Sequence, residues 1–210
     1  NQPISEKILK KIIESIKKYK CDVIIFSDFR HGIFNKNSIP DFTKAAPKKI
    51  FKVADSQVAT RWGNITDFWG FDLITPNERE ARFSLADQDS SISTLTRELG
   101  KKSNFKNIIL KLAERGIVSV NRQKKKNYNG KDKTIAFALP SFANKIVDTT
   151  GTGDALLSYS ALSLVKTKSL VVSSILGSIA AACECEKDGN VSIKPEEIIK
   201  KINQIQNSSS

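Results

Sequence analysis

The chain has 210 residues, of which 40% are hydrophobic and 27% are charged, a balance typical of globular proteins. This length supports one large domain better than two. No apolar run approaches the roughly 18 residues that a membrane-spanning helix needs, and the amino end, NQPISEKILKK, lacks the apolar segment of a signal peptide. The composition therefore argues against membrane-spanning and secreted classes, and we expect a cytoplasmic protein.

The net charge of +12 has several interpretations. It would suit a nucleic acid, an anionic membrane surface or an anionic small molecule as partner, or simply a lysine-rich surface in contact with water. The densest basic run, residues 122–133, contains Asn129-Gly130, a strong turn signal. We interpret this run as the solvated tip of a hairpin, with a binding patch as the alternative. Because no RNA-binding motif or zinc finger accompanies it, we do not expect a nucleic-acid partner. We also expect no membrane partner.

The cysteine content argues against two kinds of structural site. Three cysteines and one histidine are too few for a disulfide framework or a zinc ligand set. We therefore expect reduced thiols at Cys21, Cys183 and Cys185.

The residue pattern predicts alternating strands and helices. In chain order we expect a helix at 4–19, a strand at 22–26, a helix at 39–46, strands at 49–54 and 71–75, helices at 78–85 and 92–99, strands at 107–112, 116–121 and 134–139, and helices at 154–166, 169–185 and 195–205. This alternation favours a doubly wound α/β sheet flanked by helices, in which ligands bind beyond the carboxyl ends of the strands.

Polar residues directly follow three of the predicted strands. They are Ser27-Asp28, Asp55-Ser56-Gln57 and Pro76-Asn77-Glu78. Because the carboxyl ends of parallel strands meet at one edge of a sheet, we expect these three segments to line that edge.

The stretch KIVDTTGTGDALLSYSALSLV, residues 145–165, leads from apolar and β-branched residues through Asp148 and two glycines into a helix. A helix start presents free N–H groups and a partial positive charge, and Gly151 and Gly153 allow an anion to approach them closely. A carboxylate at Asp154 repels such an anion, which makes sense if it removes a proton from a hydroxyl that attacks a bound phosphoryl group. The alternative is a capped helix start with Asp154 as a favourable first-turn acid. The residues alone leave both interpretations open.

Two motifs in this chain resemble those of the ribokinase-like (PfkB) carbohydrate kinases. The segment Asp148–Asp154, DTTGTGD, is similar to the family signature, with Thr152 where alanine is usual. The Asn-x-x-Glu motif of the family is present as Asn77–Glu80, after the strand FDLIT. A P-loop is absent, and the dinucleotide fingerprint lacks its third glycine at Leu156.

Within that family the chain most resembles the heptose-phosphate kinases of lipopolysaccharide precursor synthesis. Their Ser-Asp-Tyr-x-x-Gly loop is matched by residues 27–32, and their Leu-Thr-Pro-Asn segment by residues 74–77. Their Asp-Pro-Lys strand end is matched only at Asp55, with departures at Ser56 and Gln57. The resemblance spans residues 1–206 as the carboxy-terminal portion of a kinase domain and leaves 207–210 as a polar tail. The amino-terminal segment and lid of the family have no counterpart, so we expect weak nucleotide binding and poor turnover from this chain alone.

The resemblance implies the roles of the central residues. Asp154 would be the catalytic base, and Gly151, Thr152 and Gly153 would form the anion hole. Glu80 would organise the Mg²⁺ shell through water, where the alternative is an exposed helix acid. Asn77 would lie near the nucleotide phosphates, and Asp148 is a candidate for holding a monovalent cation.

Further binding residues are also carried over from the resemblance. The nucleotide turn of the family, Thr-x-Gly-x-x-Gly, reads here as residues 111–116, so Lys111, Ala113 and Gly116 would contact the nucleotide. Gly189 would flank the adenine at the end of a small-residue helix, for which ordinary helix packing is the alternative. Asp28 would contact the sugar, and its alternative is an ordinary turn acid.

These expectations add up to an ATP- and Mg²⁺-dependent kinase for a sugar or sugar phosphate. The first choice of acceptor is a D-glycero-D-manno-heptose 7-phosphate type. A generic fructokinase or ribokinase activity is the second, and a non-catalytic nucleotide- or sugar-sensing module of the same fold is the third. The resemblance leaves room for a homodimer and for a fused nucleotidyltransferase domain in the complete protein.

Overall fold

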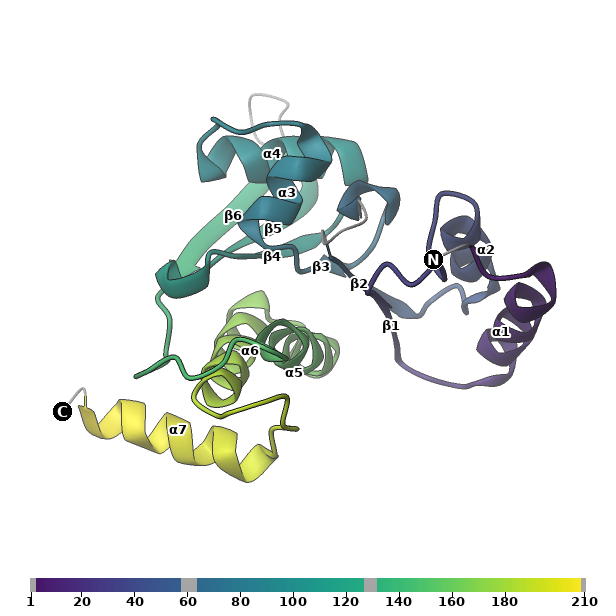
Figure 1. The fold of residues 1–210 in the computed structure, drawn as a ribbon. Coiled ribbons are helices and arrows are strands. Elements are labelled where there is room, and N and C mark those ends of the chain that lie inside the picture. The colour runs from purple at the N-terminus through teal and green to yellow at the C-terminus, as the bar shows by residue number, and fades with distance from the viewer. Residues whose placement is uncertain (1–2, 58–63, 127–131, 209–210) are drawn as a thin grey trace. The chain divides into compact units, whose positions relative to one another are not determined.

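A computed structural model describes residues 3–57, 64–126 and 132–208 (Figure 1). The hairpin tip expected at Asn129-Gly130 lies outside these residues. The chain divides into two compact units. One comprises Asn1–Lys111 with Val120–Ala136, and the other Leu112–Ser119 with Phe137–Ser210.

Every predicted helix and strand is present, with ends displaced by a few residues. The elements are α1 (Glu6–Lys18), β1 (Val23–Asp28), α2 (Ser38–Ala45), β2 (Phe51–Ser56), β3 (Leu73–Ile74), α3 (Glu78–Leu85), α4 (Ile92–Ser103), β4 (Asn107–Lys111), β5 (Ile117–Lys126), β6 (Asp132–Leu139), α5 (Thr152–Thr167), α6 (Leu170–Cys185) and α7 (Pro195–Ser208). Two short 3₁₀ helices, η1 (Ile65–Asp67) and η2 (Ala113–Arg115), were not predicted.

The strands form one mixed six-stranded sheet in the order β1-β2-β3-β4-β5-β6. Strands β1 to β4 pair in parallel, with Asp28 opposite Ser56 and Ala54 opposite Ile74. The α/β class predicted from the alternating pattern is therefore confirmed. Because these neighbouring strands are parallel, their carboxyl ends share one edge of the sheet.

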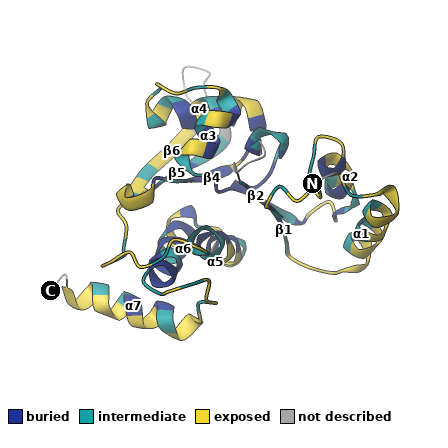
Figure 2. Cartoon of the chain, viewed as in Figure 1, coloured by how far each residue is buried: buried dark blue, intermediate teal, exposed yellow. Residues whose placement is uncertain are grey.

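An aromatic cluster forms much of the core of the first unit. The rings of Phe26, Phe34, Phe68 and Phe71 meet at inclined or edge-on angles, with the Phe26 and Phe71 centroids 5.0 Å apart. Such geometry places the positive edge of one ring against the negative face of another. Buried residues continue along β2 to β4 (Figure 2). This core fixes the strands whose ends carry the polar residues.

Small residues allow α5 and α6 to approach closely in the second unit. The Ser173 hydroxyl donates to the Ser160 carbonyl oxygen at 2.8 Å, and the Ser160 hydroxyl donates back to that of Ser173 at 3.2 Å. A Cβ at Gly177 would lie 2.0 Å from the Ser160 hydroxyl oxygen. Helix α6 packs in turn on α7 through a cluster of Ile179, Ala180, Cys183 and Ile198.

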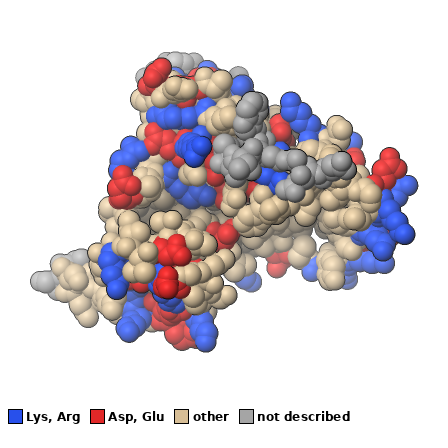
Figure 3. Space-filling view, in the orientation of Figure 1, with Lys and Arg blue, Asp and Glu red and all other residues tan. Residues whose placement is uncertain are grey.

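Charged side chains of both signs are interspersed on the face seen in Figure 3. Helix α1 carries its lysines beside Glu6 and Glu14, and none of its residues is buried.

In the part of the chain that the structure describes, no helix has the length and apolarity to cross a membrane.

Candidate active site

Asp28 ends β1 and ties it to β2. The residue is 2% exposed, and its Oδ2 accepts hydrogen bonds from the Ser56 hydroxyl at 3.0 Å and from Arg30 Nη1 at 2.6 Å. Its Oδ1 accepts the Arg30 backbone N–H at 2.9 Å. Asp28 therefore has the role of a turn acid, which was the alternative to sugar binding. The same carboxylate also accepts a hydrogen bond from the neighbouring strand β2.

Arg30 and Asp67 complete this cluster, and Asp67 was not predicted as a site residue. Arg30 adopts a left-handed backbone conformation (φ 62°), and its buried Nε has no hydrogen-bond partner among the described residues. Burial raises the pKa of Asp67, the Lys36 and Arg30 charges oppose this shift, and the Asp28 charge adds to it. Asp67 lies on η1, which shows no periodic pattern in the sequence. The cluster gathers charges of both signs at the carboxyl ends of β1 and β2.

Asp55 and Lys111 form a second polar pair at the same edge. Lys111 Nζ donates to the two Asp55 carboxylate oxygens at 3.1 and 3.3 Å, and Asp55 is buried. Asn77 pairs with Lys111 through an isolated parallel bridge. The prediction that polar segments after the first three strands line one edge is therefore confirmed for the first unit.

Asn77 and Glu80 form a reciprocal capping box at the start of α3. The Asn77 side chain accepts the Glu80 backbone N–H at 2.8 Å, and Glu80 Oε2 accepts the Asn77 backbone N–H at 2.7 Å. Glu80 is only 5% exposed, so the alternative of an exposed helix acid is wrong. The Asn-x-x-Glu spacing therefore stabilises the helix start, because the two side chains accept hydrogen bonds from two backbone N–H groups that have no partner within the helix.

Glu80 contributes one buried carboxylate, whose Oε2 accepts the Asn77 N–H. The described residues contain no cluster of three or more His, Cys, Asp or Glu side chains that could hold a metal ion. Mg²⁺ often binds proteins through one or two carboxylates while keeping several waters. A single carboxylate such as Glu80 would hold such an ion through water rather than as one of several direct ligands.

In the second unit, Asp148 organises the turn before α5. Its Oδ1 accepts the Thr150 N–H at 2.9 Å and the Thr150 hydroxyl at 2.8 Å, and its Oδ2 accepts the Gly189 N–H at 3.2 Å. These hydrogen bonds, that of the Thr150 N–H first, lower the pKa of Asp148. Asp148 and Gly189, predicted separately as cation and adenine residues, are thus in direct contact.

Gly151 begins α5 and has the conformation that the anion-cradle interpretation needs. Its φ is 81°, and it supplies no side-chain cap to the helix. Thr152 and Gly153 open the helix and Asp154 lies in its first turn. No side chain caps this helix start, although the Thr152 N–H donates to the Thr149 carbonyl oxygen at 3.3 Å. N–H groups at a helix start are suited to binding an anion. The first-turn position of Asp154 also agrees with the structural alternative, so the geometry leaves its role as base a proposal.

The segment predicted to contact the nucleotide forms a tight turn around η2. The Leu112 N–H donates to the Gly116 carbonyl oxygen at 2.8 Å, and the Gly116 N–H donates to that of Ala113 at 2.9 Å. Ala113 has a φ of 54°, a left-handed conformation, at the position where the resembled motif has glycine. A Cβ at Gly116 would lie 2.1 Å from the Leu139 carbonyl oxygen, so only glycine fits there. The first residue of the segment, Lys111, binds Asp55 as described above.

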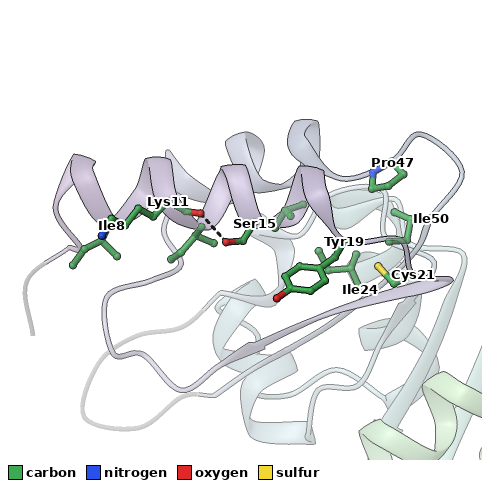
Figure 4. Close-up of a pocket in the computed structure, with 10 residues that line it drawn as sticks. Ile8, Lys11, Ser15, Tyr19, Cys21, Ile24, Pro47 and Ile50 are labelled. Carbon is green, nitrogen blue, oxygen red and sulfur yellow. Dashed lines mark hydrogen bonds between the residues drawn. The ribbon is translucent and has the colours of Figure 1, made fainter.

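The first unit also contains an apolar cavity of about 390 Å³ that includes none of the predicted site residues (Figure 4). It is lined by α1 and the segments around β1 and β2, with Ile8, Ile12, Tyr19 and Ile24 among its walls. Its lining offers few polar groups, so it does not suit a phosphorylated ligand.

A comparison with protein-family models decides the family. The model described as "pfkB family carbohydrate kinase" matches residues 34–197, most of the chain. The chain belongs to the pfkB family. Both the glycine turn of α5 and the Asn77–Glu80 box of this pfkB-family chain lie within the matched region.

Curated relatives of this pfkB-family chain are named "Bifunctional protein HldE". Those of Bradyrhizobium sp. (strain ORS 278) and Aliarcobacter butzleri (strain RM4018) are each 25% identical to it, over 208 and 202 residues. The matches cover 95% and 94% of this chain and 39% of each relative. The chain therefore spans about two fifths of the length of these relatives.

Solved structures show the same fold. Phosphofructokinase-2 from Escherichia coli in complex with potassium has a TM-score of 0.78 at 15% identity, covering 97% of this chain and 64% of that one. Arabidopsis thaliana ribokinase complexed with ribose and ATP has a TM-score of 0.68 at 19% identity, covering 96% and 60%. The ribokinase-like fold expected from the sequence is confirmed.

Proposed function

We propose that this chain is part of an ATP-dependent kinase that phosphorylates a sugar or sugar phosphate. The observation that carries the proposal is the start of α5, where a left-handed Gly151 leads into uncapped helix N–H groups with Asp154 in the first turn. Membership of a carbohydrate kinase family supports it. Phosphoryl transfer needs little covalent chemistry from a protein beyond positioning, charge stabilisation and a base.

The second unit would supply the base and the anion hole. Asp154 would accept the proton of the acceptor hydroxyl as its oxygen attacks the γ-phosphorus. The N–H groups at Gly151, Thr152 and Gly153 would stabilise the negative charge on the phosphoryl oxygens in transfer. The turn that links Asp148 to Gly189 would support the adenine side of the nucleotide, and Asp148 would be a candidate for a monovalent cation.

The first unit would supply metal and substrate contacts. Glu80 would hold Mg²⁺ through water, and Asn77 would contact the nucleotide phosphates. A bound Mg²⁺ would neutralise charge on the phosphate oxygens. Lys111 would contact the nucleotide, and Asp28, oriented by Ser56 and Arg30, would contact the sugar. Ala113 and Gly116, which belong to the second unit, would also contact the nucleotide.

For the acceptor we propose a D-glycero-D-manno-heptose 7-phosphate type, as part of lipopolysaccharide precursor synthesis in the cytoplasm. The names of the HldE relatives and the heptose-kinase-like segments at residues 27–32 and 74–77 support this choice. The same names describe bifunctional proteins, so we also propose that the complete protein has a second activity. A fructokinase or ribokinase activity is the second candidate, favoured by the fold of the solved relatives.

The test uses the chain extended to its natural amino end. ADP release is followed with Mg-ATP and a panel of heptoses, hexoses and pentoses with and without a phosphate group, in the parent and in Asp154→Asn. We expect turnover that depends on the acceptor and falls about 10²- to 10⁴-fold in the variant, as is typical when a general base is removed.

The control is Glu196→Gln, which removes a first-turn acid from α7 of the same unit. It should keep the turnover of the parent, because it tests the loss of a helix-start charge without the loss of a base. If no acceptor stimulates ADP release, the kinase proposal fails. If Asp154→Asn behaves like Glu196→Gln, Asp154 is a structural first-turn acid.

A further inference from the structure

Glu184 is a buried carboxylate near the end of α6. It is 1% exposed, in a stretch of alanines and cysteines. Its Oε1 accepts the Val191 backbone N–H at 2.8 Å, whereas its Oε2 is buried and has no hydrogen-bond partner among the described residues. Burying a carboxylate without full hydrogen bonding is costly, so its position requires an explanation.

The carboxylate lies directly against Gly151. A Cβ built on Gly151 would lie 2.6 Å from Glu184 Oε1 and 2.5 Å from Asn190 Oδ1. The two side-chain oxygens therefore occupy the space that a side chain at position 151 would need. Glycine at this position is required both by its positive φ and by these neighbours.

This placement also agrees with the charge at the start of α5. The amino end of a helix carries a partial positive charge, and Gly151 offers no side chain to cap it. A carboxylate from α6 therefore stands near the place where a capping side chain of α5 would otherwise lie. The side chain that fills this place therefore comes from a different helix.

The segment that follows Glu184 is joined to the residues before Gly151 by further hydrogen bonds. The Cys185 carbonyl oxygen accepts the N–H groups of Val147 and Asp148, at 2.8 and 3.2 Å. The Gly189 N–H donates to Asp148 Oδ2. Backbone hydrogen bonds thus hold residues 147–148, and the side-chain oxygens of Glu184 and Asn190 lie beside Gly151.

We propose that Glu184 is a positioning residue for the anion hole, fixing the Gly151 peptide and with it the direction of the N–H groups and of Asp154. The inference rests on the proposed function, because the anion hole is the site that it orients. A displacement of about 1 Å in such a site can cost about 10²-fold in rate. What matters is the reach and shape of the Glu184 side chain.

The test compares Glu184→Gln with Glu184→Asp in the extended protein. Glutamine keeps the reach and an oxygen that can accept the Val191 N–H, so kcat should stay within about threefold of the parent. Aspartate keeps the charge but is one methylene shorter, so it withdraws from Gly151. We expect kcat to fall about 10- to 100-fold in Glu184→Asp, with a much smaller change in the KM for ATP.

Amide hydrogen exchange gives a readout that does not depend on activity. Exchange at residues 150–154 should be faster in Glu184→Asp than in the parent and unchanged in Glu184→Gln. The control is Glu186→Gln, because Glu186 accepts the Asn144 N–H and pairs with Lys201 without contacting Gly151. It is expected to lower the melting temperature without changing loop exchange or kcat.

The outcomes separate this inference from the kinase proposal. Faster loop exchange in Glu184→Asp alone supports the positioning role, even if the parent shows no acceptor-dependent turnover, which would count against the kinase proposal. Unchanged loop exchange in Glu184→Asp overturns the inference. So does an equal fall of kcat in Glu184→Asp and Glu186→Gln, because loss of stability would then explain both.

Discussion

The Ser56 hydroxyl donates a 3.0 Å hydrogen bond to Asp28 Oδ2 and so connects the carboxyl ends of two neighbouring parallel strands. Ser56 stands where the resembled heptose kinases have the proline of Asp-Pro-Lys, a residue without a hydrogen-bonding side chain. The departure therefore adds a donor to the residue proposed to contact the sugar. With Arg30 on the same oxygen, Asp28 has a fixed orientation at the strand ends.

Ser56→Ala should destabilise the first unit. The hydroxyl bonds a buried carboxylate, and hydrogen bonds to charged groups contribute about 1.5–3 kcal/mol, so we expect a loss of about 1–3 kcal/mol in the free energy of unfolding. Urea unfolding followed by circular dichroism measures it. Ser93→Ala, an exposed serine on α4, is the control and should change stability by less than about 0.5 kcal/mol. Equal effects would show that the Ser56–Asp28 bond adds nothing.

Glu80→Gln should separate the metal role of Glu80 from its capping role. The amide oxygen of glutamine still accepts the Asn77 N–H, as in other capping boxes, so the melting temperature should change little. Removing the charge should raise the Mg²⁺ concentration for half-maximal turnover about tenfold, as the loss of groups that orient a metal commonly does. Mg²⁺ titrations of the extended protein measure this. An unchanged Mg²⁺ dependence would restrict Glu80 to the cap.

Gly116→Ala should strongly lower the stability of the fold. The position combines a φ of 84° with a Cβ site 2.1 Å from the Leu139 carbonyl oxygen, so both strain and overlap oppose a side chain. Strain alone costs about 1–3 kcal/mol, and we expect a larger total loss in thermal or urea unfolding. Gly70→Ala is the matched control, because Gly70 has a φ of 74° with open space around its Cβ site. Similar losses in both variants would mean that the backbone near Leu139 moves aside easily.

Asp148→Asn should alter the acid dependence of stability. Hydrogen bonds, that of the Thr150 N–H first, hold the folded-state pKa of Asp148 below 3.8, so its carboxylate stabilises the fold above that pH. That contribution is lost as the pH falls through the lower, folded-state pKa. The variant lacks it at neutral pH and should lose less stability below about pH 4. Urea unfolding at several pH values measures this, with the exposed Asp188→Asn as control. If the free energy of unfolding has the same pH dependence in Asp148→Asn and the parent, this prediction is wrong.

Much of the fold could be predicted because its signals are local. The short apolar runs of β1 and β4 predict buried strands, and the apolar residues of α1 repeat with the helical period. The order of polar residues after strands then placed Asp28, Asp55 and Asn77 at one edge. Family resemblance added the glycine turn before Asp154. These signals need only a few neighbouring residues.

Other site features depend on contacts between distant residues and could not be predicted in this way. Asp67 joins Asp28 through η1, which has no periodic signal. The Asn-x-x-Glu spacing also indicates a capping box, yet the sequence analysis considered Glu80 only as a metal residue or as an exposed helix acid. Glu184 reaches Gly151 from 33 positions along the chain, and its only trace is an acid inside an apolar, small-residue helix.

The hydrogen bonds between residues 147–148 and the Cys185–Gly189 segment also bear on the order of folding. The glycines of the proposed anion hole emerge from the ribosome well before the segment that is hydrogen-bonded to the residues preceding them. Closing that loop of about 40 residues is slow compared with forming the local turns of α5 and α6. We therefore expect the turn at Gly151 to be among the last parts of the second unit to reach its native structure. A nascent chain that stops at Cys183 should have the glycines of the cradle without its native shape.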